Sequence, residues 1–504
     1  DCMTQNSVVT VCKQGSLLAI SDQHEKACRL LEDALSYTRV SMVYERGTQR
    51  MVSTPYDCYA YKQDANGLLP RRLICAAGYL HRITRVLKQH GLQVQLKDFT
   101  KPPAPATFQP HWDRLEGVEW KWMQQRCIQR LVTEPYMQLK CPPGYGKSFL
   151  LYCLAKVLPK AKIVVSTQSV DVLEQLHAEL ASRLPNVGLV TGASKRFGRR
   201  INCVSGKSLH RVIEPPDLLV VDEVHECGTD DYMEKFASPA FRFARHIGLS
   251  ANAGQRPDGA WFELEGFFGP VLIDLSYQDC VKHGAVVPIE VHWRDVVMDK
   301  DPASGLTNRV SKLRSGIWCN RFRNRLIAQD ARSFGDRQVL ISVDVIEHAL
   351  QLKRELPHYT LCYSEDGLSE TDRQRAIKEK LLPPDEPVMT RERRRQLKSA
   401  FEHGKLKHVI ATTVWKRGVD FKSLEVLIRA DAGASLISDT QIPGRTSRLS
   451  HATSKTSSIV VDYLDQFGSF FRERANVRRR NYKEHGWTQR LPGNGGNPRQ
   501  RSLL

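Results

Sequence analysis

Short apolar runs alternate with helical patterns through the first half of the chain. The runs lie at 137–141, 162–167, 217–222 and 246–250. Segments with a helical pattern, such as 147–158 and 169–183, stand between them. Strands that are buried on both faces of a parallel sheet are uniformly apolar in this way. The pattern predicts a parallel α/β domain over residues 107–286.

The same alternation starts again in the second half. Candidate strands lie at 339–343, 360–363, 408–412, 425–428 and 458–462, with helical segments between them. This predicts a second α/β domain over residues 287–466. Two consecutive α/β domains of similar size leave a cleft between them, and such a cleft is the default place for a ligand.

The two ends of the chain follow other patterns. Residues 1–106 mix short apolar runs with helical patterns and close on the proline-rich stretch 101–105, which disfavours helix. We expect a small α+β accessory domain there that contacts duplex DNA. From 467 to 504 the chain is strongly basic and ends in a Gly- and Asn-rich stretch, which predicts a basic helix followed by a tail.

The net charge of the chain indicates which kind of binding partner to expect. The chain has 74 Lys and Arg against 55 Asp and Glu, a formal charge of +19, which suits a polyanion. We find no apolar run long enough to span a bilayer and no signal-peptide pattern, so we expect a soluble, cytoplasmic protein. The 13 cysteines form no CxxC pair, which argues against a zinc module and against a disulfide framework.

A glycine-rich loop follows the first strand. The sequence Cys141-Pro-Pro-Gly-Tyr-Gly-Lys-Ser148 precedes a leucine-rich helix. Glycines let backbone N–H groups turn toward phosphate oxygens, a lysine reaches the β- and γ-phosphates, and a serine hydroxyl ligates magnesium. We therefore expect ATP and Mg²⁺, held by Gly144, Tyr145, Gly146, Lys147, Ser148 and Phe149.

Two acids end a later strand. Asp222 closes the apolar run 217–222, Glu223 comes directly after it, and His225 follows. A carboxylate at the carboxyl tip of such a strand faces the crevice where ligands bind. We expect Asp222 to hold magnesium and Glu223 to accept a proton from the attacking water.

In this order the motifs resemble those of superfamily 2 helicases of the DExH type. Members of that superfamily have two RecA-like lobes, so the resemblance implies the same fold here. In the first lobe it implies that Gln124 contacts adenine and that Ser166, Thr167 and Gln168 contact the nucleic-acid backbone. It also implies that His225, Ser250 and Asn252 couple hydrolysis to movement. The chain departs from the usual Ser-Ala-Thr motif at Asn252.

The second lobe completes the resemblance. Residues 441–448 match the helicase pattern Gln-x-x-Gly-Arg-x-x-Arg. The resemblance implies that Gln441, Arg445 and Arg448 act in catalysis. It also implies that Gly418 and Asp420 bind ATP, and that Thr412 and Thr413 contact the nucleic acid and couple it to hydrolysis. Arg445 and Arg448 are three residues apart, so one helical face presents both guanidinium groups to the transferred phosphoryl group.

Further segments of the chain show a weaker similarity to one subgroup of these helicases. Segments 67–71, 90–92, 250–259 (including Arg256), 264–270 and 482–487 resemble the UvsW-like branch-migrating DNA helicases of phages. This implies an ATP hydrolase that remodels forked, looped or four-way DNA in recombination or repair, acting as a monomer on DNA in the cytoplasm of an infected bacterium.

Three alternatives stay open at this point: an RNA helicase of the same superfamily, the motor of a nuclease complex, and a binding protein whose ATPase has decayed. Three basic runs, 195–200, 321–323 and 391–395, are candidates for the nucleic-acid track, although such runs are also common on solvated faces.

Overall fold

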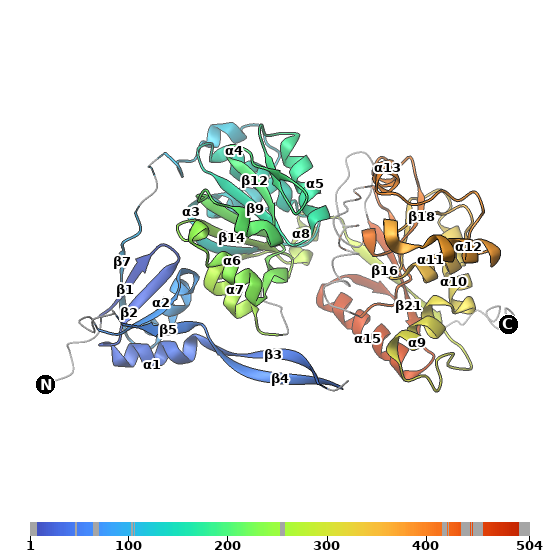
Figure 1. Cartoon of the computed structure of the whole chain (residues 1–504), viewed down its shortest axis with the longest axis horizontal. Helices are drawn as coiled ribbons and strands as arrows, with labels where there is room; N and C mark the ends of the chain where they lie inside the picture. Colours follow the sequence, from blue (N-terminus) through green and yellow to red (C-terminus); the bar gives the residue numbers. More distant parts are fainter. Residues whose placement is uncertain are drawn as a thin grey trace. The chain divides into compact units, whose positions relative to one another are not determined.

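The computed structural model describes most of the chain. The described residues are 8–45, 48–63, 70–101, 104, 106–252, 258–415, 421, 423–434, 444, 446 and 457–492. The chain divides into two compact units, one formed by 1–142 with 146–276, and the other by 143–145 with 277–504. The first unit holds the N-terminal domain and the first lobe, and the second unit holds the second lobe (Figure 1).

The N-terminal region is a small α+β domain, as predicted. Its described strands form a five-stranded sheet in the order β5-β6-β2-β1-β7, and α1 and α2 cover that sheet. Their bounds are β1 (Val8–Gln14), β2 (Leu17–Ser21), α1 (Glu25–Ala34), β5 (Tyr59–Lys62), β6 (Arg72–Ala76), α2 (Leu80–Gln89) and β7 (Gln93–Asp98). Two further strands, β3 (Ser36–Glu45) and β4 (Thr48–Asp57), pair with each other in a separate two-stranded ribbon.

The N-terminal domain packs directly on the first lobe. The Tyr79 hydroxyl donates to the carbonyl of Phe262 at 2.8 Å, and the Arg82 guanidinium donates to the buried carboxylate of Glu265. A Cβ at Gly78 would lie 2.3 Å from the carbonyl oxygen of Glu265, so only glycine allows this approach of the two backbones. The two regions therefore share one core.

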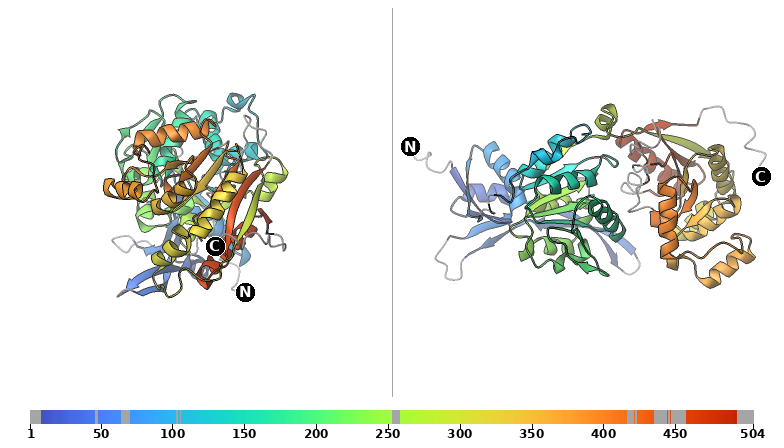
Figure 2. Two further views of the ribbon diagram at one scale, coloured as in Figure 1. Left: turned by 90° about the vertical axis from the view of Figure 1, so that its right-hand side faces the viewer. Right: turned by 90° about the horizontal axis from the view of Figure 1, so that it is seen from above.

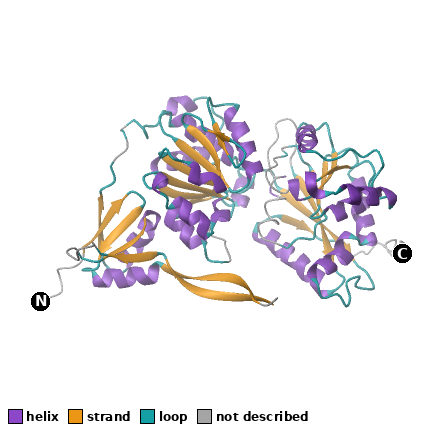
Figure 3. Cartoon of the chain, viewed as in Figure 1, coloured by secondary structure: helices purple, strands orange, loops and turns teal. Residues whose placement is uncertain are grey.

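The first lobe is a doubly covered parallel sheet. Its described strands run in the order β11-β10-β12-β9-β13-β14-β8-β15, and all the pairs are parallel except β10 with β11. Helices lie on both faces of the sheet (Figure 3). The bounds are α3 (Gln124–Thr133), β8 (Tyr136–Lys140), α4 (Lys147–Val157), β9 (Ile163–Thr167), α5 (Val170–Ala181), β10 (Gly188–Val190), β11 (Lys195–Arg196), β12 (Ile201–Ser205), β13 (Leu218–Asp222), α6 (Asp230–Phe236), β14 (Arg245–Ser250), α7 (Trp261–Phe268) and β15 (Val271–Asp274).

The second lobe repeats this plan. Its described strands are ordered β18-β19-β17-β20-β21-β16-β22, with every pair parallel. The bounds are α8 (Tyr277–Lys282), β16 (Ile289–Val296), α9 (Arg309–Leu313), α10 (Arg321–Ser333), β17 (Val339–Ser342), α11 (Ile346–Glu355), β18 (Thr360–Cys362), α12 (Glu370–Lys378), α13 (Arg391–Glu402), β19 (His408–Ala411), β20 (Val426–Arg429), β21 (Ser458–Asp465), α15 (Ser469–Glu484) and β22 (Thr488–Arg490).

The structure confirms the predicted fold class of two tandem RecA-like lobes after a small α+β domain. The basic C-terminal helix is α15, and most of the predicted tail lies outside the described residues. Within the described part of the chain, no helix is long and apolar enough to cross a membrane, and no group of three or more potential metal ligands occurs.

Candidate functional site

Adjacent strands of the first lobe bring the predicted residues to one edge of the sheet. Strands β9, β13, β14 and β8 are neighbours and parallel, so their carboxyl ends meet at the same edge. At that edge β9 ends in Ser166 and Thr167, both buried, with Gln168 just beyond them. Asp222 ends β13, Ser250 ends β14, and the glycine-rich loop follows β8.

The loop has the backbone that an anion site needs. Gly144 and Gly146 have φ of 83° and 110°, and Gly146 caps α4, whose first three residues are Lys147, Ser148 and Phe149. A Cβ at Gly146 would lie 3.0 Å from Nε2 of Gln124. Glycine at 146 therefore lets Gln124 approach the loop, and the N–H groups and dipole of a helix N-terminus such as that of α4 favour a phosphate.

Lys147 joins the two acids of β13. Its Nζ lies 3.0 Å from Oδ1 of Asp222 and also forms an ion pair with Oε1 of Glu223. Burial opposes the charged ammonium, but the two carboxylates outweigh it and raise the pKa of Lys147. Burial alone would raise the pKa of Glu223, yet the Lys147 ammonium and His225 lower it. Glu223 is therefore ionised at neutral pH.

A second set of contacts links His225 to β14. The Nδ1 atom of His225 lies 2.7 Å from the hydroxyl of Ser250 and 3.4 Å from Oε2 of Glu223. The same hydroxyl accepts the backbone N–H of Asn252 at 2.9 Å. Ser250 thus bridges the segment after β13 and the segment after β14. The Asn252 carboxamide is buried and forms no hydrogen bond within the described residues.

Gln124 lies on the other side of the loop, at the start of α3. It is 1% exposed, and its Oε1 accepts the backbone N–H of Lys121 at 3.0 Å. Sequence reasoning missed Trp120, whose ring meets that of Phe149 edge to face at 6.2 Å. Its place just upstream of the glutamine motif was the available signal.

The second lobe is described in part. Thr412 is buried directly after β19, with its N–H donating to the carbonyl of Cys362, and Thr413 is exposed. The other predicted residues of this lobe, Gly418, Asp420, Gln441, Arg445 and Arg448, lie outside the described residues, and so does Arg256 of the first lobe.

Sequence comparison identifies the second lobe. Residues 332–450 match the model of the helicase conserved C-terminal domain. A search of curated protein sequences finds no match.

Several solved structures share the fold. Dbp5 of Saccharomyces cerevisiae bound to RNA and ADP BeF3 is 12% identical, with a TM-score of 0.51, over 77% of this chain and 94% of that chain. A putative HsdR subunit of a type I restriction enzyme from Vibrio vulnificus is 15% identical, with a TM-score of 0.51, over 94% and 98%. The chain thus contains a helicase conserved C-terminal domain, in a fold that it shares with these proteins.

The structure of UvsW from phage T4 also matches the chain, with 14% identity and a TM-score of 0.40, over 96% of this chain and 98% of that chain.

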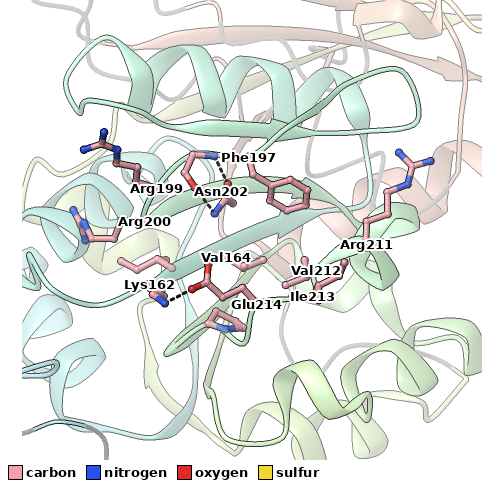
Figure 4. A pocket seen from close by; sticks show the side chains of 13 residues that line it. Lys162, Val164, Phe197, Arg199, Arg200, Asn202, Arg211, Val212, Ile213 and Glu214 are labelled. Carbon is pink, nitrogen blue, oxygen red and sulfur yellow. Dashed lines mark hydrogen bonds and ion pairs between the residues drawn. The ribbon is translucent and has the colours of Figure 1, made fainter.

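The basic run 195–200 borders a hollow in the first lobe. A cavity of about 240 Å³ lies at the amino ends of β9 and β12, the opposite end of these strands from the loop of Lys147 (Figure 4). Arg200 donates to three carbonyls, those of Ala155, Leu158 and Ala161, and so closes the C-terminal end of α4. Part of the run 195–200 is therefore structural.

Three elements supply buried arginines to the second lobe. Arg323 of α10, Arg429 of β20 and Arg478 of α15 are each 0% exposed. Their partners include the buried acids Asp431, Asp462 and Asp465. Arg323 and Arg478 also donate to the carbonyls of Ala430 and Gly433, directly after β20. This buried ionic network holds the segment from which the chain continues toward Gln441 and Arg445.

Proposed function

We propose that the chain is an ATP-dependent DNA helicase or translocase that remodels branched DNA, such as forks, displacement loops, R-loops and four-way junctions, in recombination, repair or replication. The observation that supports this most strongly is the cluster of Lys147, Asp222 and Glu223 beside a glycine loop, in a chain whose second lobe matches the helicase conserved C-terminal domain. A lysine between two half-buried carboxylates next to a helix N-terminus suits a triphosphate.

Each residue at this edge has a proposed part in hydrolysis. The ammonium of Lys147 would move from the carboxylates to the β- and γ-phosphates, and Gln124 would recognise adenine. Ser148 and Asp222 would hold Mg²⁺, which neutralises phosphate charge when bound. The backbone at Gly146 and the carboxylate of Asp222 fit these groups. Glu223, ionised beside Lys147, would accept the proton of the attacking water.

Coupling to movement requires that the affinity for DNA differs between nucleotide states. The contact of His225 with Ser250 supports a relay from Glu223 to the segment that contains Asn252. Ser166, Thr167 and Gln168 of the first lobe, and Thr412 and Thr413 of the second, would grip the backbone of one strand. Arg445 and Arg448 would stabilise charge on the transferred phosphoryl group, with Gln441, Gly418 and Asp420 supporting them.

The choice of DNA rests on the sequence resemblance to branch-migrating helicases. RNA is the second candidate, because Dbp5, which shares the fold, was solved bound to RNA. Superfamily 2 motors grip mainly the sugar-phosphate backbone, so the motifs do not separate the two substrates.

A panel of substrates tests the proposal. ATP hydrolysis and strand separation are measured on forked DNA, a displacement loop, a four-way junction, single-stranded RNA and an RNA–DNA hybrid. We expect activity on the branched DNA species, loss of hydrolysis in Lys147→Ala and normal hydrolysis in Lys160→Ala, an exposed lysine just after α4. Stimulation by RNA alone would refute the DNA assignment, and hydrolysis unchanged in Lys147→Ala would refute the site.

A further inference from the structure

The β3–β4 ribbon is an extended arm of the N-terminal domain. Its strands pair in register from Ser36 with Asp57 to Glu45 with Thr48, and no third strand joins them within the described residues. Both views in Figure 2, like Figure 1, show it leaving the five-stranded sheet. A ten-residue strand spans about 34 Å, and an isolated hairpin of this kind is only marginally stable in water.

Contacts with the first lobe hold the base of the ribbon. The Tyr37 ring stacks on Phe262 with centroids 5.3 Å apart, and its hydroxyl donates to Glu263. Arg39 forms ion pairs with Asp230 at 2.6 Å and with Glu263 at 3.5 Å. These partners lie on α6 and α7, so the base is fixed to the lobe that carries Lys147 and Glu223.

Beyond its base, the side chains of the ribbon that the structure describes are mostly exposed. They include Ser41, Met51, Ser53 and Thr54, with Met51 70% exposed. From residue 40 to residue 56 the sequence has two arginines, Arg46 and Arg50, and one acid, Glu45. Hydroxyl and guanidinium groups are the usual donors to phosphates and sugars.

The shape of the ribbon selects between kinds of nucleic acid. The major groove of B-form DNA, about 12 Å wide, admits a two-stranded ribbon, whereas the major groove of A-form RNA is too narrow and deep. The surrounding residues 1–101 carry 14 Lys and Arg against 9 Asp and Glu, which complements a polyanion. We propose that the β3–β4 ribbon lies in the major groove of the duplex part of the DNA substrate. This inference rests on the proposed function and adds a duplex contact to it.

A shortened ribbon tests the inference. In the variant, residues 42–51 are replaced by Asn-Gly, which joins the paired residues Ser41 and Val52 through a two-residue turn and keeps Tyr37 and Arg39 in place. We expect binding to duplex and forked DNA to weaken about tenfold or more, while single-stranded DNA binding and single-strand-stimulated ATP hydrolysis stay within about twofold of wild type. Guanine N7 atoms protected from dimethyl sulfate by the wild type should become reactive.

A full-length variant with altered charge tests how much the charge of the ribbon, rather than its length, contributes to duplex binding. Ser53→Glu places a negative group on the ribbon and should weaken duplex binding, whereas Ser53→Gln, of equal size and neutral, should not. Duplex affinity and N7 protection unchanged in the shortened variant would overturn the inference. A second result would also overturn the inference: the shortened variant no longer self-associates but still binds duplex DNA. The ribbon would then pair with a second copy of the chain. Wild-type hydrolysis insensitive to every nucleic acid would instead refute the proposed function, whatever the ribbon does.

Discussion

Glu223 has a backbone conformation that non-glycine residues rarely adopt. Its φ is 52°, and its carboxylate meets both Lys147 and His225. Strained backbone of this kind persists where the surrounding structure fixes it, often at catalytic positions. The conformation turns the acid from the end of β13 toward the edge where the glycine loop lies.

Replacing that acid tests its role. Glu223→Gln keeps the size of the side chain but removes the base, so we expect kcat for ATP hydrolysis to fall about 100- to 10,000-fold with little change in KM. Steady-state ATPase assays give both constants. Glu234→Gln, on an exposed position of α6, should retain wild-type values. A kcat within tenfold of wild type would show that another group takes the proton.

His246 gives the first lobe a pH-dependent stability. The ring is fully buried on β14, and burial lowers its pKa from 6.5 to about 4 despite contacts with the carbonyls of Phe241 and Phe267. Between these two pH values the ring is protonated in the unfolded chain but neutral in the folded chain. The free energy of unfolding therefore falls as the pH drops from 6.5 toward 4.

At pH 5 this loss amounts to about 2 kcal/mol relative to pH 7. Urea unfolding at the two pH values measures it. In His246→Gln the difference between the two pH values should shrink by that amount, even if the variant is less stable at both. An unchanged pH dependence would contradict the assignment.

At the scale of elements, α15 illustrates how a basic stretch is misread. The run of arginines from 472 to 480 indicates a basic surface helix. Yet Arg478 is turned inward, where it pairs with Asp462 and donates to Gly433, whereas Arg480 is exposed. One helix therefore has both a solvated and an ionic, buried face.

The two arginines form a matched pair for mutation. Removing one partner of a buried ion pair leaves the other charge uncompensated, so Arg478→Met should destabilise the second lobe by about 3–5 kcal/mol. Arg480→Met should change its stability by less than about 0.5 kcal/mol. Denaturant unfolding of the full chain, followed by tryptophan fluorescence, compares them. Equal effects would mean that Asp462 finds another partner.

Sequence pattern predicted most of the core strands and few of the others. The central strands β9, β13, β17 and β19 are largely apolar because both faces are covered, and that signal is strong. Strand β16 alternates apolar and polar residues, and β3 and β4 mix the two, so none of these three strands has a continuous apolar run. The ribbon depends on contacts with α6 and α7, which are remote in sequence.

The candidate site likewise has residues that the sequence predicted and contacts that it did not. Spacing along the chain was enough to propose Lys147, Asp222 and Glu223, because loop and strand ends have fixed positions in a parallel sheet. The Ser250 bridge and the ring of Trp120 against Phe149 depend on side-chain packing, which a pattern of residue types does not encode.

At the scale of the whole molecule, the formal charge of +19 predicts that binding to nucleic acid weakens as salt rises. Each single-strand phosphate that is neutralised contributes about −0.7 to the slope of log affinity against log salt concentration. With about five such contacts, raising salt fourfold should weaken single-stranded DNA binding about a hundredfold. Fluorescence anisotropy over a salt series measures the slope, and Lys147→Ala should share it when no nucleotide is added. A flat dependence would exclude a phosphate track.

The shared core of the N-terminal domain and the first lobe limits how this protein can be divided. An expression fragment beginning near residue 107 would leave Phe262 and the carboxylates of Glu263 and Glu265 without the tyrosines and arginines that now cover them. Helix α7 would then expose an apolar and negatively charged surface, and we expect such a fragment to aggregate. The first 276 residues are thus one indivisible piece for protein engineering, and modules are better exchanged after Ser276 than at the proline-rich linker.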